Sequence, residues 1–460
     1  MKLTIKGYLS DRQFFSTLLR LSIPIIIQKL LVSSLNMVDT LMVGRLGDLP
    51  VAAVGAANQM YFIFMLFMEG ISAACSIFAA QYWGARDKKR ILHVVGLGVL
   101  ATALFGGAVT GLALTCPRPF LLLFSRDEAV LRLGLEYLSV VCYSYILAGF
   151  TQVISGVLRS MGNTRLPMLI SVLSILTNVV FNALLIFGLA GFPRMGVRGA
   201  AVATVIARVL ELALLVLFAF RKGAPLRGRL RDYFSFHSGF VRYLFSATLP
   251  VLINDTLWGI GFTLYTVAFG MLGTAALAAS QIANAAHNVF TVFSFSVATT
   301  ALVIIGNLVG AGDLERARDY SKKILVTSVL AGLVTGAILA LSAPLILRLY
   351  DVSAAVRGTA INLMRLYGAI MPLMVTAGSL IIGVFRGGGD PGFAMRSELF
   401  CLWCIGLPLA FGLVLLFPGM PPELITLCML AEDAVKVTMG LRHFRKDGWL
   451  RSLVEAPGET

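Results

Sequence analysis

The sequence predicts an all-α polytopic membrane protein with twelve transmembrane helices in two six-helix lobes. Its 460 residues are 58% hydrophobic and only 13% charged, whereas soluble proteins carry about 25% charged residues. Twelve apolar runs are each long enough to cross a bilayer as a helix, which takes roughly 20 residues. The second half of the chain also repeats landmarks of the first half. We therefore expect two lobes related by a pseudo-two-fold axis along the membrane normal.

The apolar runs follow one another with short connections. They do not show the alternation over about ten residues that is typical of strands in a membrane barrel. The longest connection is basic and rich in turn-forming residues, so we expect a cytoplasmic linker over 223–241. We predict an N-terminal lobe over 1–222, a C-terminal lobe over 242–445 and a cytoplasmic tail over 446–460. The runs lie near 19–44, 51–81, 91–116, 131–158, 166–190, 198–221, 242–270, 275–309, 323–349, 358–385, 393–417 and 422–442.

Lysine and arginine residues predict the orientation of the chain. If the N-terminus is inside, the inner segments hold 26 of these residues, the outer loops hold 8, and four lie within apolar runs. Basic residues concentrate in cytoplasmic loops, so we expect both termini in the cytoplasm of a multi-pass protein of the cell (inner or plasma) membrane. The formal net charge of +15 fits basic loops beside anionic lipid. It therefore does not call for nucleic acid as a partner.

Landmark residues recur at one spacing along the chain. The ten residues from Arg159 match those from Arg386 at a shift of 227, and four further pairs are 226 positions apart. Such self-similarity indicates a duplicated unit. Each half holds six runs, an even number, so both halves enter the membrane in the same direction. Two such lobes with a cavity between them favour a transporter over a channel or a receptor. The four pairs are Pro24–Pro250, Gly44–Gly270, Gly47–Gly273 and Gly84–Gly310.

The first run carries a proline and a carboxylate. Pro24 removes a backbone hydrogen bond, so we predict a bend in the helix there. Asp39 is costly at membrane depth, and we expect it to face a protein interior or a wet cavity and to have a function. At about 100° per residue, Gln28, Asn36 and Asp39 share one side of the helix. The alternative is that Asp39 lies at the helix end, where it is solvated or caps the helix.

The fifth run carries a polar stripe made of Ser171, Ser174, Asn178 and Asn182. Neutral amides on a membrane helix often hold neighbouring helices together, and that is the simpler interpretation of the stripe alone. Beside a buried carboxylate, the same oxygens would replace the hydration shell of a cation. The predicted cation-coupling residues are Asp39, Asn36, Asn178, Asn182 and Thr204; Asp39, Asn178, Asn182 and Thr204 would hold Na⁺ if Na⁺ is the coupling ion.

Other ionisable residues within the runs suggest a cavity that attracts cations. Asp255 lies in the seventh run, and its alternative role is local helix pairing. At the repeat spacing Asp39 aligns with Tyr265, so we expect the two lobes to have the same fold but different functional roles. Charged residues also occur three or four positions apart, as in Arg208 with Glu211 and in Glu432 or Asp433 with Lys436, which indicates compensated pairs. The predicted substrate-cavity residues are Asp255, Trp258, Glu69, Met65, Phe62 and Gln28.

The sequence contains no pattern typical of a nucleotide-phosphate loop, a metal cluster or a nucleophile–base pair. We therefore expect a protein that is not an enzyme, has no cofactor beyond a coupling ion, and uses an ion gradient as its energy source. Cys401 and Cys404 have CxxC spacing, but they lie in an apolar run without a second pair. We interpret them as small buried hydrophobic residues.

With Pro24, the run NMVDTLMVGRLG from Asn36 to Gly47, the paired segments RSMGNTRLPM and RGGGDPGFAM and the repeat of six plus six runs, the sequence resembles the multidrug and toxic compound extrusion (MATE) transporters. The resemblance extends from about Phe14 to Arg445. It implies twelve helices in two lobes, and export of organic cations or other drug-like compounds in exchange for Na⁺ or H⁺.

The resemblance also implies roles for individual residues. It places a coupling site in the first lobe at Asp39, Asn178, Asn182 and Thr204, and it places the bend of the first helix at Pro24. Some members have a second Asp at the position of Asn182, so this site has one formal charge fewer. Members with a cation site in the second lobe use acids in the seventh and tenth helices. The seventh run here offers Asp255, whereas the tenth offers no acid.

Two other function classes remain as alternatives. A flippase for lipid-linked polysaccharide or cell-wall precursors would need unpaired basic residues in its cavity for a pyrophosphate; Lys29 and Arg365 are candidates, but the acidic Asp39, Asp255 and Glu69 argue against it. A membrane enzyme acting on lipids would need clustered histidines, and the four histidines are far apart in sequence. For the transporter we expect a monomer that binds small, often cationic, organic substrates.

Overall fold

The computed structural model of the chain describes residues 11–350, 352–446 and 448–454, apart from the side chain of Asn36. Every regular element within these residues is helical, and none of them forms a strand. The all-α prediction is therefore confirmed. The first half contains α2 (Arg12–Gly44), α3 (Asp48–Gly84), α4 (Lys88–Thr115), α5 (Pro117–Leu121), α6 (Glu128–Val141), α7 (Tyr143–Ser160), α8 (Arg165–Phe187), η1 (Leu189–Gly191), α9 (Gly196–Ala219) and α10 (Leu230–Phe234).

The second half contains two helices that are interrupted by π-helical segments. Residues of η3 (Ser379–Phe385) follow α14 directly, and η4 (Leu402–Gly406) connects α15 to α16. The remaining bounds are α11 (Ser238–Met271), α12 (Thr274–Gly310), α13 (Leu314–Ile346), η2 (Leu347–Leu349), α14 (Ala354–Gly378), α15 (Pro391–Cys401), α16 (Leu407–Leu416) and α17 (Glu423–Phe444).

The helices account for the predicted apolar runs. In the described ranges nine helices are long and apolar enough to cross a membrane, and the pair α6 and α7, bent by 47°, makes a tenth. Helices α11 and α17 occupy the two remaining predicted runs. Both carry charged side chains, which lower their mean hydropathy: Arg242 and Asp255 in α11, and Glu423, Glu432, Asp433, Lys436 and Arg442 in α17. The prediction of a polytopic membrane protein is confirmed.

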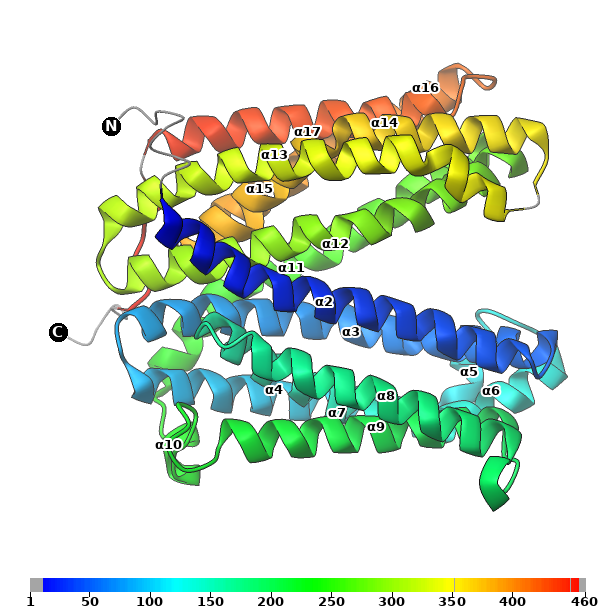
Figure 1. Cartoon of the computed structure of the whole chain (residues 1–460), viewed down its shortest axis with the longest axis horizontal. Coiled ribbons are helices and arrows are strands. Elements are labelled where there is room, and N and C mark those ends of the chain that lie inside the picture. The colour runs from blue at the N-terminus through cyan, green and yellow to red at the C-terminus, as the bar shows by residue number, and fades with distance from the viewer. Residues whose placement is uncertain (1–10, 351, 447, 455–460) are drawn as a thin grey trace. The chain divides into compact units, whose positions relative to one another are not determined.

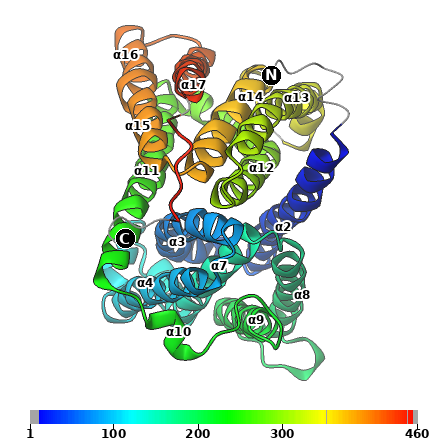
Figure 2. The same ribbon diagram turned by 90° about the vertical axis from the view of Figure 1, so that its left-hand side faces the viewer.

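The described residues fall into two compact units. One unit comprises Ile27–Ala79 and Asp87–Leu244; the other comprises the described parts of Met1–Ile26, Ala80–Arg86 and Phe245–Thr460. In the first unit α8 packs on α9, and α4 packs on α7. Figure 1 shows these four helices side-on and Figure 2 shows them almost end-on, so they form a bundle with similar axis directions.

Two glycine pairs of the internal repeat have matching structural roles. Gly47 and Gly273, in the loops after α2 and α11, have φ angles of +111° and +110°, a region that side chains other than glycine rarely adopt. Gly84 and Gly310 lie at a crossing of α3 and α12. A Cβ atom at Gly84 would overlap the backbone carbonyl of Asn307, and one at Gly310 would overlap that of Gln81.

These contacts at the α3–α12 crossing are related by the repeat. Gln81 and Asn307 are 226 positions apart, as are Gly84 and Gly310. The contact of Gly84 with Asn307 therefore corresponds, through the repeat, to the contact of Gly310 with Gln81. Ala80 and Gly306 are also 226 positions apart, and a Cβ atom at Gly306 would lie 2.7 Å from the Cβ of Ala80. The contacts between these two segments therefore follow the internal repeat.

The proline of the first helix does not interrupt it. Helix α2 continues through Pro24, and α11 continues through the aligned Pro250. However, the boundary between the two compact units falls between Ile26 and Ile27, just after Pro24. The missing hydrogen bond at Pro24 thus lies where α2 passes from one unit to the other.

Small residues allow close helix packing in the unit that contains α13 and α14. A Cβ atom at Gly336 would overlap the carbonyl oxygen of Gly368, and a Cβ atom at Gly368 would overlap that of Gly336. Gly332 lies one turn earlier against Pro372. Close backbone approach at small residues is typical of helix pairs in membranes, where lipid and protein side chains are equally apolar.

Candidate functional site

A cavity of about 360 Å³ lies in the unit formed by Ile27–Ala79 and Asp87–Leu244. Its walls come from α2, α3, α6, α7, α8 and α9. The apolar part includes Phe62, Met65 and Ile175. The polar and charged lining residues are Asp39, Thr40, Asn58, Tyr61, Tyr137, Ser144, Ser171, Ser174, Asn178, Asn182, Thr204, Arg208 and Glu211.

Four of the predicted coupling residues form one chain of hydrogen bonds in this cavity. Asn182 Nδ2 donates to Asp39 Oδ1 at 2.7 Å and to Asn178 Oδ1 at 3.0 Å. Asn178 Nδ2 in turn donates to Thr204 Oγ1 at 3.4 Å. Asn178 and Asn182 are four residues apart and therefore lie on the same face of α8. The predicted grouping of α2, α8 and α9 side chains is present, while the side chain of Asn36 lies outside the described residues.

The carbonyl oxygen of the Asn182 side chain is an unused acceptor. Asn182 is only 1% exposed, and its Oδ1 atom has no hydrogen-bond partner among the described residues. A buried acceptor without a donor costs about 1–3 kcal/mol, so it favours any donor or cation that can enter. The site thus offers a carboxylate, a free amide oxygen and a threonine hydroxyl within one hydrogen-bonded chain.

A second polar group in the cavity is centred on Glu211, which the sequence had placed only in a helix pair with Arg208. The pair is confirmed, with Arg208 Nη1 2.6 Å from Glu211 Oε2. Ser171 also donates to Glu211 Oε1 at 3.0 Å, and Gln28 Nε2 donates to Ser171 Oγ at 2.8 Å. Glu211 is 4% exposed and well supplied with donors. The i, i+3 spacing in the sequence predicted the pair, but nothing in the sequence indicated that it faces the same cavity as Asp39.

The predicted substrate-cavity residues separate into three groups. Phe62 and Met65 line the cavity with Asp39. Gln28 and Glu69 are in the same unit but do not line it; Gln28 bonds Ser171, and Glu69 accepts a hydrogen bond from Gln152.

The last two predicted cavity residues belong to the other compact unit. Trp258 stacks on Phe262, with 5.7 Å between the ring centroids. Asp255 accepts two hydrogen bonds from the guanidinium of Arg386, at 2.6 and 3.3 Å. It is therefore an ion-paired carboxylate rather than an isolated one. Its partner comes from the α14–α15 connection, 131 residues away in sequence, rather than from a local helix pair.

Two duplicated halves of membrane-spanning helices, with a polar cavity inside a helical unit, define a polytopic membrane transporter. The sequence model of the MatE family matches residues 24–184 and 250–411, that is, one match in each half of the repeat. The chain belongs to the MatE family. Both matches begin at the aligned prolines, Pro24 and Pro250.

Curated relatives cover nearly the whole chain. The uncharacterized transporter YisQ of Bacillus subtilis (strain 168) is 25% identical over 444 residues, which are 96% of each protein. The multidrug resistance protein NorM of Burkholderia vietnamiensis is 29% identical over 418 residues, 86% of each protein. A probable multidrug resistance protein NorM of Halalkalibacterium halodurans is 27% identical over 399 residues, 84% of this chain and 85% of that protein.

Solved structures show the same fold. An outward-facing multidrug resistance MATE family transporter of the MOP superfamily has a TM-score of 0.84 at 21% identity, covering 94% of this chain and 95% of that chain. A MATE structure in the bent conformation has a TM-score of 0.85 at 20% identity, with coverage of 97% and 98%. The MATE recognition and the polytopic all-α fold class are confirmed.

Proposed function

We propose that the protein is a secondary active antiporter that exports organic, often cationic, drug-like compounds in exchange for Na⁺ or H⁺. The observation that carries this proposal is the chain of Asp39, Asn182, Asn178 and Thr204 inside the cavity, with the unused Oδ1 acceptor of Asn182. The similarity to proteins named multidrug resistance protein NorM supports the substrate class.

Asp39 would act as the residue that exchanges the coupling ion. With a proton or Na⁺ bound, its carboxyl group is neutralised; without the ion, it is an anion in a partly buried place. An ion gradient drives transport only if the two arrangements of the protein differ in their affinity for the ion. The proline in α2 and the unit boundary two residues later support a role for this helix in the transition, by alternating access.

Na⁺ would be held by oxygen ligands from Asp39, Asn178, Asn182 and Thr204. Asparagine in place of a second aspartate gives this set one formal negative charge. One bound proton or one Na⁺ therefore neutralises it, and the electrostatics of the site favour neither ion over the other. A pH gradient and a Na⁺ gradient applied separately distinguish H⁺ from Na⁺ as the coupling ion.

The cavity does not favour a phosphate-bearing lipid as substrate. Arg208 is the basic residue among its described lining residues, and it is paired with Glu211. A pyrophosphate would need cations that are free to bind it. We infer that a flippase of lipid-linked precursors is the less suitable function.

The proposal is tested with Asp39→Asn, Asp39→Glu and the control Asp48→Asn, whose side chain is exposed at the start of α3. Purified protein in vesicles is given a pH gradient or a Na⁺ gradient separately, and efflux of a fluorescent organic cation is followed. We expect Asp39→Asn to bind the cation yet fail to concentrate it, Asp39→Glu to retain part of the activity, and the control to match the wild type. Near-normal uphill export by Asp39→Asn would remove Asp39 from the coupling mechanism.

A further inference from the structure

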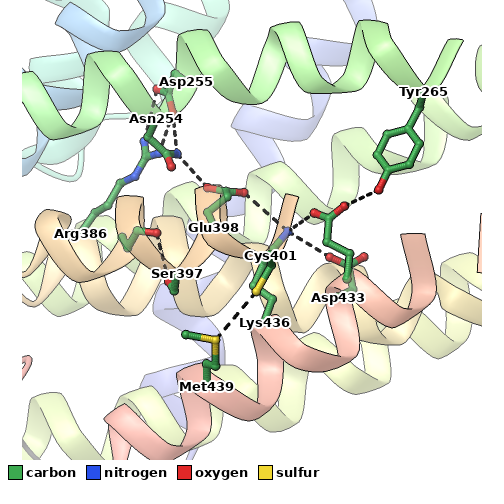
Figure 3. Close-up of polar contacts among 12 residues, drawn as sticks. Asn254, Asp255, Tyr265, Arg386, Ser397, Glu398, Cys401, Asp433, Lys436 and Met439 are labelled. Carbon is green, nitrogen blue, oxygen red and sulfur yellow. Dashed lines mark hydrogen bonds and ion pairs between the residues drawn. The ribbon is translucent and has the colours of Figure 1, made fainter. Parts of the chain in front are cut away.

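A second group of ionisable side chains lies in the unit that contains Phe245–Thr460, apart from the Asp39 cavity. Figure 3 shows its members converging from α11, α15, α17 and the connection that carries Arg386. We call it the Lys436 cluster. Its ionisable members are Asp255, Arg386, Glu398, Glu432, Asp433 and Lys436.

Lys436 is the centre of the cluster. Its Nζ atom lies 3.0 Å from Glu432 Oε1, 3.2 Å from Asp433 Oδ1 and 3.8 Å from Glu398 Oε1. Asn254 Nδ2 connects Glu398, at 2.7 Å, with Asp255, at 3.3 Å. Six side chains are therefore continuous through hydrogen bonds and ion pairs from Asp255 to Asp433.

The charges of the Lys436 cluster do not balance. Asp255, Glu398, Glu432 and Asp433 supply four carboxylates, whereas Arg386 and Lys436 supply two cations. With every group ionised, the formal charge would be −2, and the side chains of Lys436 and Glu432 are only 6% and 7% exposed. Uncompensated charge is strongly unfavourable in a poorly solvated, membrane-spanning bundle. The imbalance therefore favours a bound proton or another monovalent cation.

The donors around each carboxylate indicate where the proton resides. Asp255 has two hydrogen bonds from Arg386, and Glu432 accepts from both Lys436 and the Tyr265 hydroxyl, the latter at 2.7 Å. Charge-assisted bonds favour the ionised form of a carboxyl group. The other two carboxyl groups have weaker charge compensation. Glu398 lies 3.8 Å from the Lys436 ammonium. Asp433 accepts a hydrogen bond from Lys436, but Lys436 also interacts with the other carboxylates of the cluster.

An unused acceptor in the cluster also indicates a missing donor. Asn254 is 1% exposed, and its Oδ1 atom has no hydrogen-bond partner in the described part of the chain. Its amide nitrogen already bonds Glu398, so the free oxygen lies beside the carboxyl group with weak compensation. A protonated carboxyl group or a hydrated proton supplies the donor that this oxygen lacks.

The backbone around the cluster is specialised. The π-helical segment η3 ends directly before Arg386, and η4 begins directly after α15, which carries Glu398. π-Helical insertions are rare and occur frequently at functional sites. A Cβ atom at Gly406, the last residue of η4, would overlap the Tyr265 hydroxyl and lie 2.5 Å from Glu432 Oε2. Glycine at this position leaves room for the Tyr265–Glu432 hydrogen bond.

We propose that the Lys436 cluster is a proton-binding site, with Glu398 and Asp433 as the carboxyl groups that hold the exchangeable proton. The ammonium of Lys436 already lies at the centre of these carboxylates, which favours a proton over a metal ion as the additional occupant. The side chains of Asp255 and Glu398 are 20% and 13% exposed, so this end of the cluster is more accessible than the buried Lys436 and Glu432. Protonation adds H⁺ from water to a carboxylate oxygen and makes the formal charge of the cluster one unit less negative.

The groups that face these two carboxyls come from every element packed around them. They are Asp255 and Tyr265 from α11, Arg386 from the α14–α15 connection, Cys401 from α15, and Cys428, Glu432 and Lys436 from α17. Removing a cation from this set should increase the number of protonated carboxyls, and removing an acid should reduce it. The two kinds of variant therefore have opposite expected effects.

Infrared difference spectroscopy of the carboxylic acid C=O stretch, between alkaline and neutral pH, tests the proposal on the purified full chain. All measurements use Asp39→Asn protein, so that Asp39 contributes no signal from the first cavity. We expect a protonated carboxyl signal at neutral pH that falls in Glu398→Gln or Asp433→Asn and disappears in the double variant. Lys436→Met should increase it. The control Glu315→Gln, an exposed acid at the start of α13, should leave it unchanged.

Two outcomes would overturn the proposal. The first is a signal that is absent, or that none of the cluster variants changes, in protein that elutes as a single species. The second is a signal that Na⁺, but not choline, reduces at fixed pH, because Na⁺ would then be the occupant. If Glu398→Gln does not fold, Asp433→Asn and Lys436→Met still give opposite expectations. The readout is independent of transport, so it stands even if Asp39 proves not to couple export.

Discussion

At the scale of single residues, the cavity holds two carboxylates in different settings. Asp39 is bonded by a neutral amide, whereas Glu211 is bonded by a guanidinium and two serine hydroxyls. Charge-assisted hydrogen bonds are the stronger kind, and Glu211 forms such an ion pair with Arg208. Under the proposed function, Asp39 is therefore the carboxylate of the two that would exchange the coupling ion.

The Glu211 pair should set the charge that a substrate meets. In Glu211→Gln, Arg208 loses its counter-charge and the cavity becomes more positive. One unit charge at about 10 Å contributes about 1–2 kcal/mol at an effective dielectric constant near 20, so we expect organic cations to bind roughly tenfold more weakly and neutral compounds to bind as before. Equilibrium binding of a matched cationic and neutral pair measures this. The exposed Glu136→Gln serves as the control, and equal losses for both compounds would contradict the prediction.

The ion pair of Asp255 changes the expected effect of its mutation. Arg386 is 4% exposed at its side chain, so Asp255→Asn leaves a buried guanidinium with less compensation. We expect a loss of about 3 kcal/mol in the free energy of unfolding, at the lower end for broken buried pairs, because Asp255 retains 20% exposure. Asp255→Asn/Arg386→Gln should lose less than the sum of its single variants. Thermal unfolding in detergent measures all three, and strict additivity would show that the pair makes no net contribution.

At the scale of helices, close backbone contacts decide which elements can meet. The crossing of α3 with α12 depends on Gly84 and Gly310, where any side chain would meet a backbone carbonyl rather than a movable side chain. Hydrophobic pattern alone does not select such a crossing, because all faces of these helices are largely apolar. The glycines therefore specify the contact.

Substitution at the crossing should destabilise the fold. We expect Gly310→Ala to lower the free energy of unfolding by about 1–3 kcal/mol, the range for overpacking a close contact, with Gly84→Ala acting similarly because the repeat relates the two sites. Gly107→Ala in α4 is the matched control, since a Cβ atom there meets nothing within 4 Å. Thermal unfolding of the purified variants provides the measurement. A Gly310→Ala protein as stable as Gly107→Ala would mean that α3 and α12 separate easily.

The start of α2 is attached to α13 by an ion pair outside the first span. Lys323 Nζ lies 2.5 Å from Asp11 Oδ2, and Phe14 donates its backbone N–H to Asp11 at 2.9 Å. Partial burial by itself would raise the pKa of Asp11, but the Lys323 and Phe14 hydrogen bonds outweigh it, so the pKa of Asp11 is lowered. A carboxyl group with a lowered pKa stabilises the folded state above its unfolded pKa and loses that contribution as the pH falls through its folded pKa.

The pH dependence of this attachment is testable. We expect unfolding of the wild type to become easier as the pH falls below about 4, the unfolded pKa of Asp, and Asp11→Asn to remove part of this dependence. The control is Asp313→Asn, which caps α13 rather than pairing with α2. Unfolding curves of the wild type and both variants at neutral and acidic pH measure this difference. An Asp11→Asn protein with the full acid dependence would assign the effect to other carboxyls.

At the scale of the whole molecule, orientation in the membrane remains a prediction from the basic loops. We expect cysteines introduced at 86–90 and 221–242 to react with a membrane-impermeant thiol reagent only after the cells are opened. Cys116 is exposed and follows α4, on the predicted outer side, so it should react on intact cells. Cys404 is the other exposed cysteine, so the prediction that it is buried is wrong, whereas Cys401 is buried as predicted. Labelling in a background with Cys404→Ser measures both. Reaction of either introduced site on intact cells, with Cys116 protected, would invert the topology.

The sequence determined the features that depend on local pattern. Apolar run length predicted the spanning helices, and the spacing of 226 residues predicted two equivalent halves, which the Gly84 and Gly310 contacts confirm. Helical periodicity also placed Asn178 and Asn182 on one face of α8. A neighbouring Asp39 was then sufficient to predict this group of polar residues.

The tertiary structure decided which distant side chains meet. Arg386 pairs with Asp255 from 131 residues away, and Tyr265 bonds Glu432 from 167 residues away. The sequence placed Asp255 in a substrate cavity and did not single out Glu398. The physical reason is that lipid and protein neighbours are equally apolar, so the hydrophobic pattern of a spanning helix does not show which face is buried. Close packing at glycines and the requirement to pair buried charges select those faces, and both depend on the folded arrangement of the helices.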